Sequence, residues 1–192
     1  MSPALMPIIQ TSVRTPRTAA DLIMSMDLDR NTLWTALALV AIVNTLMLYF
    51  VVQFADPRVE VPSYFGQPMT LFLLNAGLMV AYIHAMYWAG LAIGGQGRLL
   101  DVVAVVVWFQ ALWVLAQAGT MLLSLAIPAL GSLVSLAVAI WGFWIFMNFL
   151  AAALHLTSPW HSLAVLLVSF LGLVFGFGIL VAVFGGLLPA GV

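Results

Sequence analysis

The chain has 192 residues, of which 65% are hydrophobic and 6% charged, and its formal net charge is −1. Water-soluble domains carry roughly a quarter of their residues as charged side chains, so this composition excludes a soluble globular protein. Five cations against six acids exclude a basic surface for nucleic acid, and the absence of cysteine excludes disulfides and cysteine metal sites. Because residues 102–192 contain no Asp, Glu, Lys or Arg, we predict an all-α polytopic membrane protein.

Residues 1–32 are predicted to form an N-terminal cytoplasmic or interfacial segment. Thr15-Pro16 is typical of a helix N-cap followed by proline at the first helical position. A helix with one apolar stripe either lies among lipid headgroups or packs on a helix bundle, and both alternatives fit this segment. We therefore expect one amphipathic interfacial helix, whose apolar stripe consists of Ala19, Leu22, Ile23 and Met26.

Residues 33–192 are predicted to form a transmembrane domain of five helices. Crossing about 30 Å of hydrocarbon at about 1.5 Å per residue takes about 20 apolar residues. One helix over residues 102–156 would be about 80 Å long, so the chain must reverse there, and Pro128 and Gly131 mark the reversal. The predicted spans are about 33–54, 68–93, 102–127, 131–156 and 159–188.

The distribution of arginine predicts the orientation of these spans. Four arginines fall on one side of the predicted spans and only Arg58 on the other, the four being Arg14, Arg17, Arg30 and Arg98. Cationic side chains resist translocation, so we expect a cytoplasmic N-terminus and, after five crossings, a periplasmic C-terminus. The absence of lysine beside abundant Ala, Gly, Val and Leu is typical of GC-rich bacterial genomes, which favours a bacterial inner membrane.

Uncharged polar side chains lie within the predicted spans, where lipid offers them no hydrogen bonds. Interhelical hydrogen bonds of such groups contribute about 0.6–2 kcal/mol each and are our main interpretation, with a polar path as the alternative. For His84 we expect a bond to another helix rather than a metal, because a metal site needs three or four ligands. The candidate residues are Asn44, Asn75, His84, Gln110, Gln117 and Asn148.

The fifth predicted helix has one side that is nearly bare backbone. Small residues recur there at four-residue steps, a spacing that lets a second helix approach closely. The partner helix could belong to this chain or to another molecule, and the pattern does not distinguish the two. The candidate helix-packing residues are Gly172, Gly176, Gly178, Ala182 and Gly186.

A glycine-rich turn on the predicted cytoplasmic side joins the second and third helices. Asp101 follows it at the start of the third helix, where a carboxylate caps free amides and is stabilised by the helix dipole. We therefore expect Asp101 to be a cap rather than a buried functional acid. The turn residues are Gly94, Gly95, Gly97, Arg98 and Asp101.

This turn and its flanks, residues 89–103 (AGLAIGGQGRLLDVV), resemble the Yip1-domain family of bacterial type, as does the run RTPRTAA at 14–20. The resemblance implies a five-helix membrane domain with a cytoplasmic N-terminus. Eukaryotic members are linked to vesicle traffic and associate with small GTPases and with other family members. The Asp-Leu-Tyr-Gly-Pro motif familiar in those members is not found in this sequence, so GTPase binding is not carried over.

No catalytic motif is present, and we expect no enzyme activity, no cofactor and no metal site. The main functional hypothesis is a Yip1-like protein that organises membrane lipids or partner membrane proteins, including copies of itself. One alternative is a small channel, transporter or lipid translocator with a neutral polar path, which requires the polar residues to converge. Another alternative is an accessory subunit of a larger membrane complex.

Overall fold

A computed structural model describes residues 5–53 and 66–185, and the elements in these ranges are helices. Two short helices, α1 (Leu5–Arg14) and α2 (Pro16–Met24), lead into five long ones. All five are long and apolar enough to cross a membrane, α7 over Pro159–Ile179, which confirms the predicted all-α fold with five spans. The long helices are α3 (Arg30–Gln53), α4 (Pro68–Ala92), α5 (Leu99–Ala126), α6 (Pro128–Ala153) and α7 (Pro159–Gly185).

The reversal between α5 and α6 is tighter than we expected. Only Ile127, in an extended conformation, separates the two helices, and α6 begins at Pro128 instead of residue 131. Proline fits the first helical position because the amide proton that it lacks would have no partner there. Gly131 lies inside α6, where a Cβ would be 2.2 Å from Ser124 Oγ, so it permits the close approach of the two helices. The predicted end of the fifth span, residue 188, lies outside the described residues.

The N-terminal segment packs against the helix bundle, and it contains one helix more than we predicted. The additional helix, α1, is anchored by Ser12, which is fully buried and accepts a hydrogen bond of 2.9 Å from Trp108 Nε1 of α5. Helix α2 packs on α5 and α6 and buries Pro16, Ala19, Ala20 and Ile23. Two residues of the predicted apolar stripe, Leu22 and Met26, are exposed. The buried face of α2 is therefore rotated relative to the predicted one and includes Ala20.

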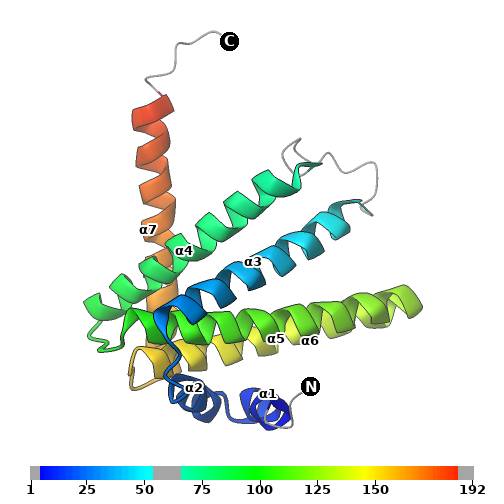
Figure 1. Cartoon of the computed structure of the whole chain (residues 1–192), viewed down its shortest axis with the longest axis horizontal. Helices are drawn as coiled ribbons and strands as arrows, with labels where there is room; N and C mark the ends of the chain where they lie inside the picture. Colours follow the sequence, from blue (N-terminus) through cyan, green and yellow to red (C-terminus); the bar gives the residue numbers. More distant parts are fainter. Residues whose placement is uncertain (1–4, 54–65, 186–192) are drawn as a thin grey trace.

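The helices converge at one end of the molecule and diverge at the other (Figure 1). We call these the Arg98 end, where α4 meets α5 and α6 meets α7, and the Ile127 end, where α5 meets α6. Buried apolar side chains concentrate at the Arg98 end, among them Ile83, Met86, Val102, Phe149 and Val165. Toward the Ile127 end, large apolar side chains are exposed, among them Leu122, Leu125, Leu133 and Leu136. The protein core therefore occupies one end of the bundle.

Candidate polar cleft and helix junction

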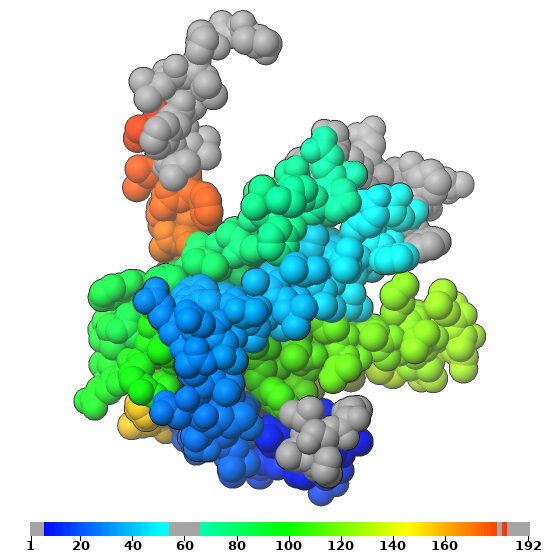
Figure 2. Space-filling view, in the orientation of Figure 1, coloured from blue at the N-terminus to red at the C-terminus, as the bar shows by residue number. Residues whose placement is uncertain are grey.

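A cleft of about 470 Å³ lies between α3 and α5 on the diverging side of the bundle. In the space-filling view, the ends of α3 and of α5 with α6 stand apart (Figure 2). The structure brings four of the six predicted polar residues to this cleft, together with Thr120. These four are Asn44 from α3, Asn75 from α4, and Gln110 and Gln117 from α5. The other lining residues are apolar: Met47, Leu48, Val51, Trp113 and Met121.

The side-chain amides of the cleft form only some of the hydrogen bonds of which they are capable. Asn75 Nδ2 donates to Thr45 Oγ1 at 3.2 Å and to the Ala41 carbonyl at 3.3 Å, which ties α4 to α3. Asn44 Nδ2 donates to Gln110 Oε1 at 3.5 Å, a long and therefore weak bond between α3 and α5. Within the described residues, the side-chain amide of Gln117 has no hydrogen-bond partner. The cleft thus retains hydrogen-bonding capacity.

Packed apolar side chains close the cleft on the side of the Arg98 end. Moving from the cleft toward that end, α3 presents Leu37 and Ala41, α4 presents Ile83, and α5 presents Val105 and Val106, all of them buried. These residues belong to the core of the protein. In this conformation the polar cleft is therefore a blind recess and not a path through the bundle.

His84 lies beyond this recess, and our expectation of a hydrogen bond from it to another helix is wrong. Its Nδ1 lies 2.8 Å from the carbonyl oxygen of Val80 in the same helix, and a carbonyl only accepts, so Nδ1 carries the proton. The contact with α3 is a stacked ring pair instead, with Trp34 at a centroid distance of 6.2 Å. His84 therefore joins α4 to α3 by packing.

Asn148 also differs from the expected interhelical role. The residue is 7% exposed, and its Nδ2 donates to the Trp144 carbonyl of the same helix at 2.8 Å. It is not among the residues that line the cleft. A polar side chain that turns back to its own helix satisfies itself without a partner helix, which sequence spacing does not reveal.

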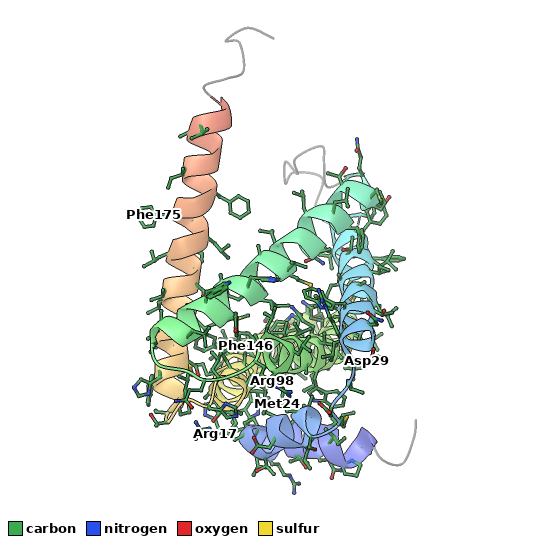
Figure 3. All side chains as sticks on the ribbon, turned by 60° about the vertical axis from the view of Figure 1, so that its left-hand side comes forward. Arg17, Met24, Asp29, Arg98, Phe146 and Phe175 are labelled. Atoms are coloured by element: carbon green, nitrogen blue, oxygen red, sulfur yellow. The ribbon has the colours of Figure 1, made fainter. Side chains whose placement is uncertain are left out.

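The predicted small-residue stripe has no partner helix within the described residues. A Cβ placed on Gly172, Gly176 or Gly178 would meet no atom within 4 Å, and Ala182 is exposed. This part of α7 stands away from the other helices, and Phe175 projects outward from it (Figure 3). Gly186 lies outside the described residues. Packing of this stripe against another helix therefore stays a prediction.

The glycine-rich turn at the Arg98 end packs against the end of α6. Its glycines are needed for different structural reasons. Gly94 has φ +99°, and it ends α4 with the paired backbone bonds of a Schellman motif. A Cβ on Gly95 would lie 2.9 Å from the Leu154 carbonyl, and one on Gly97 would lie 1.9 Å from the Ala153 carbonyl. The backbone amide of Gln96 donates to the Leu154 carbonyl at 3.0 Å, which fastens the turn to α6.

Arg98 and Asp101 form the start of α5. The carboxylate of Asp101 accepts from the backbone amide of Arg98 at 3.2 Å and from its guanidinium at 2.9 Å. The hydrogen bond to Asp101 raises the pKa of Arg98 above its ordinary value. Asp101 therefore caps the helix, and the pair holds the turn in place, with the Arg98 side chain still largely exposed.

Two charged residues at this end have structural roles that we did not predict. Arg17 lies at this end of the bundle (Figure 3). Its Nη2 donates a hydrogen bond of 2.6 Å to the Leu156 carbonyl, just after α6, while its Nε is buried without a partner among the described residues. Asp29 precedes α3 and accepts from the backbone amides of Asn31 at 3.1 Å and Thr32 at 3.3 Å. The Asp-x-x-Thr spacing before α3 was the signal for this cap.

These features define a class: an all-helical membrane protein with five spans, a packed junction at one end and a neutral polar recess toward the other. The model of the Yip1 domain matches residues 11–182, which include α2, the glycine-rich turn and every residue that lines the cleft. The chain belongs to the Yip1 domain family. Comparison with curated proteins and with solved structures gives no match.

Proposed function

We propose that this Yip1-family protein is a non-enzymatic organiser of the membrane, which holds other membrane components between its helices. The observation that supports this function best is the polar cleft. Four amide side chains from three helices face one recess, and one of them, Gln117, has no partner among the described residues. Lipid tails offer no hydrogen bonds, so a molecule that brings polar groups into the recess is favoured there.

The chemistry of the cleft favours binding over catalysis. The described residues that line it contribute amides and the Thr120 hydroxyl as polar groups, and none of them is a carboxylate, imidazole or cation. Among the described residues, no three His, Asp or Glu side chains are grouped so that they could hold a metal ion. Amides donate and accept hydrogen bonds without ionising at ordinary pH, which suits reversible recognition.

Transport is a second candidate function, and the convergence of the amides is the observation that favours it. A conducting path would need the core around Ala41, Ile83 and Val106 to open, because these buried residues close the recess. We propose binding as the first function because it needs no such rearrangement. Transport predicts solute or lipid flux in proteoliposomes that falls when Gln110 is replaced by alanine.

We further propose that the Arg98 end faces the cytoplasm and that the membrane is a bacterial inner membrane. Arg17, Arg30 and Arg98 lie at or near this end in the structure, and arginine is retained on the cytoplasmic side. In this orientation the cleft extends from about the middle of the bilayer into its periplasmic half. Single cysteines at Gln96 and Gln67 test the orientation, since an impermeant thiol reagent should label only the second from outside.

Extraction of the protein from its native membrane into polymer nanodiscs tests the organising role. Blue-native electrophoresis and lipid analysis should show a defined partner or an enriched lipid, and the Gln110→Leu/Gln117→Leu variant should lose it. A variant with Gln96→Leu serves as the control, because Gln96 is an exposed amide outside the cleft. A free monomer with the lipid composition of the bulk membrane would overturn the proposal.

A further inference from the structure

We propose that the polar cleft binds an uncharged glycerolipid, such as a diacylglycerol. Its ester and hydroxyl groups hydrogen-bond to the amides. Its acyl chains extend out of the cleft into the bilayer, between the apolar side chains at the rim. This inference rests on the proposed function and names the ligand class. Depth, charge and shape of the cleft each support it.

The amides of α5 lie below the level of the lipid headgroups. Along the helix, Gln117 is about 14 Å and Gln110 about 24 Å from Ala126, at about 1.5 Å per residue. The headgroup layer on each side of a bilayer is only about 5–8 Å thick, so both amides lie at the depth of the hydrocarbon. A lipid that reaches them must carry its polar end into the membrane interior.

The described lining of the cleft is uncharged, and this determines which kind of lipid headgroup can bind in it. None of the described residues that line the cleft is ionisable, so a phosphate there would lose its water without gaining a counter-charge from them. Hydroxyl and ester groups need only neutral donors and acceptors. Gln117 is unpartnered within the described residues, and the 3.5 Å contact between Asn44 and Gln110 is weak enough to exchange for a ligand bond.

The shape of the cleft fits the polar end of one lipid. Its volume of about 470 Å³ falls in the range of small-ligand pockets, about 300–1,000 Å³. A partner helix about 10 Å in diameter would fill that volume with about one turn, too little for a stable helix contact. The side chains of Leu48, Val51 and Met121 at the rim are apolar and exposed, as acyl chains require.

Native mass spectrometry of the full chain in phosphatidylcholine nanodiscs that contain dioleoylglycerol tests this assignment. We expect diacylglycerol to be retained by the natural sequence and by Gln96→Leu. In Gln110→Leu/Gln117→Leu its retention should fall about tenfold, the loss expected from two hydrogen bonds. A photoactivatable diacylglycerol, used on the natural sequence, should form adducts at Met47, Leu48 or Trp113, and this measurement needs no variant.

Equal retention by both variants, or photoadducts elsewhere on the bundle, would overturn the ligand assignment. Preferential retention of phosphatidylcholine would overturn it too, because that headgroup carries a phosphate. The organising role would survive such a result if a partner protein leaves the native complex when Gln110 and Gln117 are replaced. The organising role fails separately if the native extraction yields a free monomer in bulk lipid.

Discussion

The guanidinium of Arg17 donates a hydrogen bond of 2.6 Å to the backbone carbonyl of Leu156, 139 residues further along the chain. Leu156 follows the end of α6, where a cation also interacts favourably with the helix dipole. The glycine-rich turn packs on this same end of α6, through the Leu154 carbonyl. The junction at the Arg98 end therefore joins α2, the turn before α5, and the end of α6 in one packed unit.

Replacement of Arg17 by methionine should loosen α2 from the bundle. A hydrogen bond from a charged group contributes about 1.5–3 kcal/mol, and we expect a loss of stability in this range. Thermal unfolding in detergent micelles measures the loss, and limited proteolysis after residue 24 should become faster. The control is Arg14→Met, since Arg14 is exposed. Equal stability of the two variants would contradict a role for the Leu156 contact.

Gly97→Ala should destabilise the junction strongly. The new Cβ would lie 1.9 Å from the Ala153 carbonyl, a backbone atom that cannot move without shifting the end of α6. We expect a loss of about 3 kcal/mol, measured by thermal unfolding. Gly77→Ala is the matched control, because a Cβ there meets no atom of the described residues within 4 Å and alanine favours a helix by about 1 kcal/mol. Similar effects at both positions would show that the turn does not pack as described.

His155→Gly should raise stability. His155 has φ 52°, in the left-handed region, and it ends α6 with backbone bonds from His155 to Ala152 at 3.1 Å and from Leu156 to Ala151 at 2.8 Å. Glycine adopts this conformation without the steric cost, so we expect a gain of about 1 kcal/mol. His161→Gly, placed inside the first turn of α7, should instead lower stability. A loss of stability in both variants would exclude the left-handed cap.

The cap of α3 should make stability depend on pH in the acid range. The hydroxyl of Thr32 donates to the Asp29 carboxylate and, with the backbone amides of Thr32 and Asn31, lowers the pKa of Asp29 below its usual 3.8. The carboxylate therefore stabilises α3 fully above its unfolded-state pKa, and this contribution is lost as pH falls through the lowered value. Asp29→Asn keeps an acceptor at the cap and removes the titration.

Thermal unfolding between about pH 5 and pH 2 compares the two proteins. The natural sequence should lose stability more steeply on acidification than Asp29→Asn. Parallel curves would mean that the Asp29 carboxylate does not hold the start of α3.

The five spans were predictable because their length and lack of charge leave few alternatives. The interfacial segment was predictable only in part. A short helix such as α1 is not stable alone, and the buried contact between Ser12 and Trp108, from distant parts of the chain, holds it. No local pattern around residues 5–14 reports that contact.

The cleft shows the same limit of prediction from sequence, here for single residues. Gln110 and Gln117 are seven residues apart, so their common face on α5 follows from helix geometry. That Asn44 and Asn75 face them depends on how α3 and α4 rotate about their axes. Faces directed toward lipid and toward the core are equally apolar here, and sequence alone does not fix that rotation. The same uncertainty about helix rotation applies to His84 and Asn148, whose side chains hydrogen-bond to carbonyls of their own helices.

Cysteine cross-linking of α3 to α5 in intact membranes tests the shared cleft most directly, because the chain has no native cysteine. The pair Asn44→Cys with Gln110→Cys should cross-link with a short bifunctional thiol reagent, since the ends of the two natural side chains are 3.5 Å apart and the reagent spans the length that cysteine lacks. The control pair is Ile42→Cys with Gln110→Cys, as Ile42 is exposed on another face of α3. Failure of the first pair to cross-link, or equal cross-linking of both pairs, would contradict the cleft on which the proposed function depends.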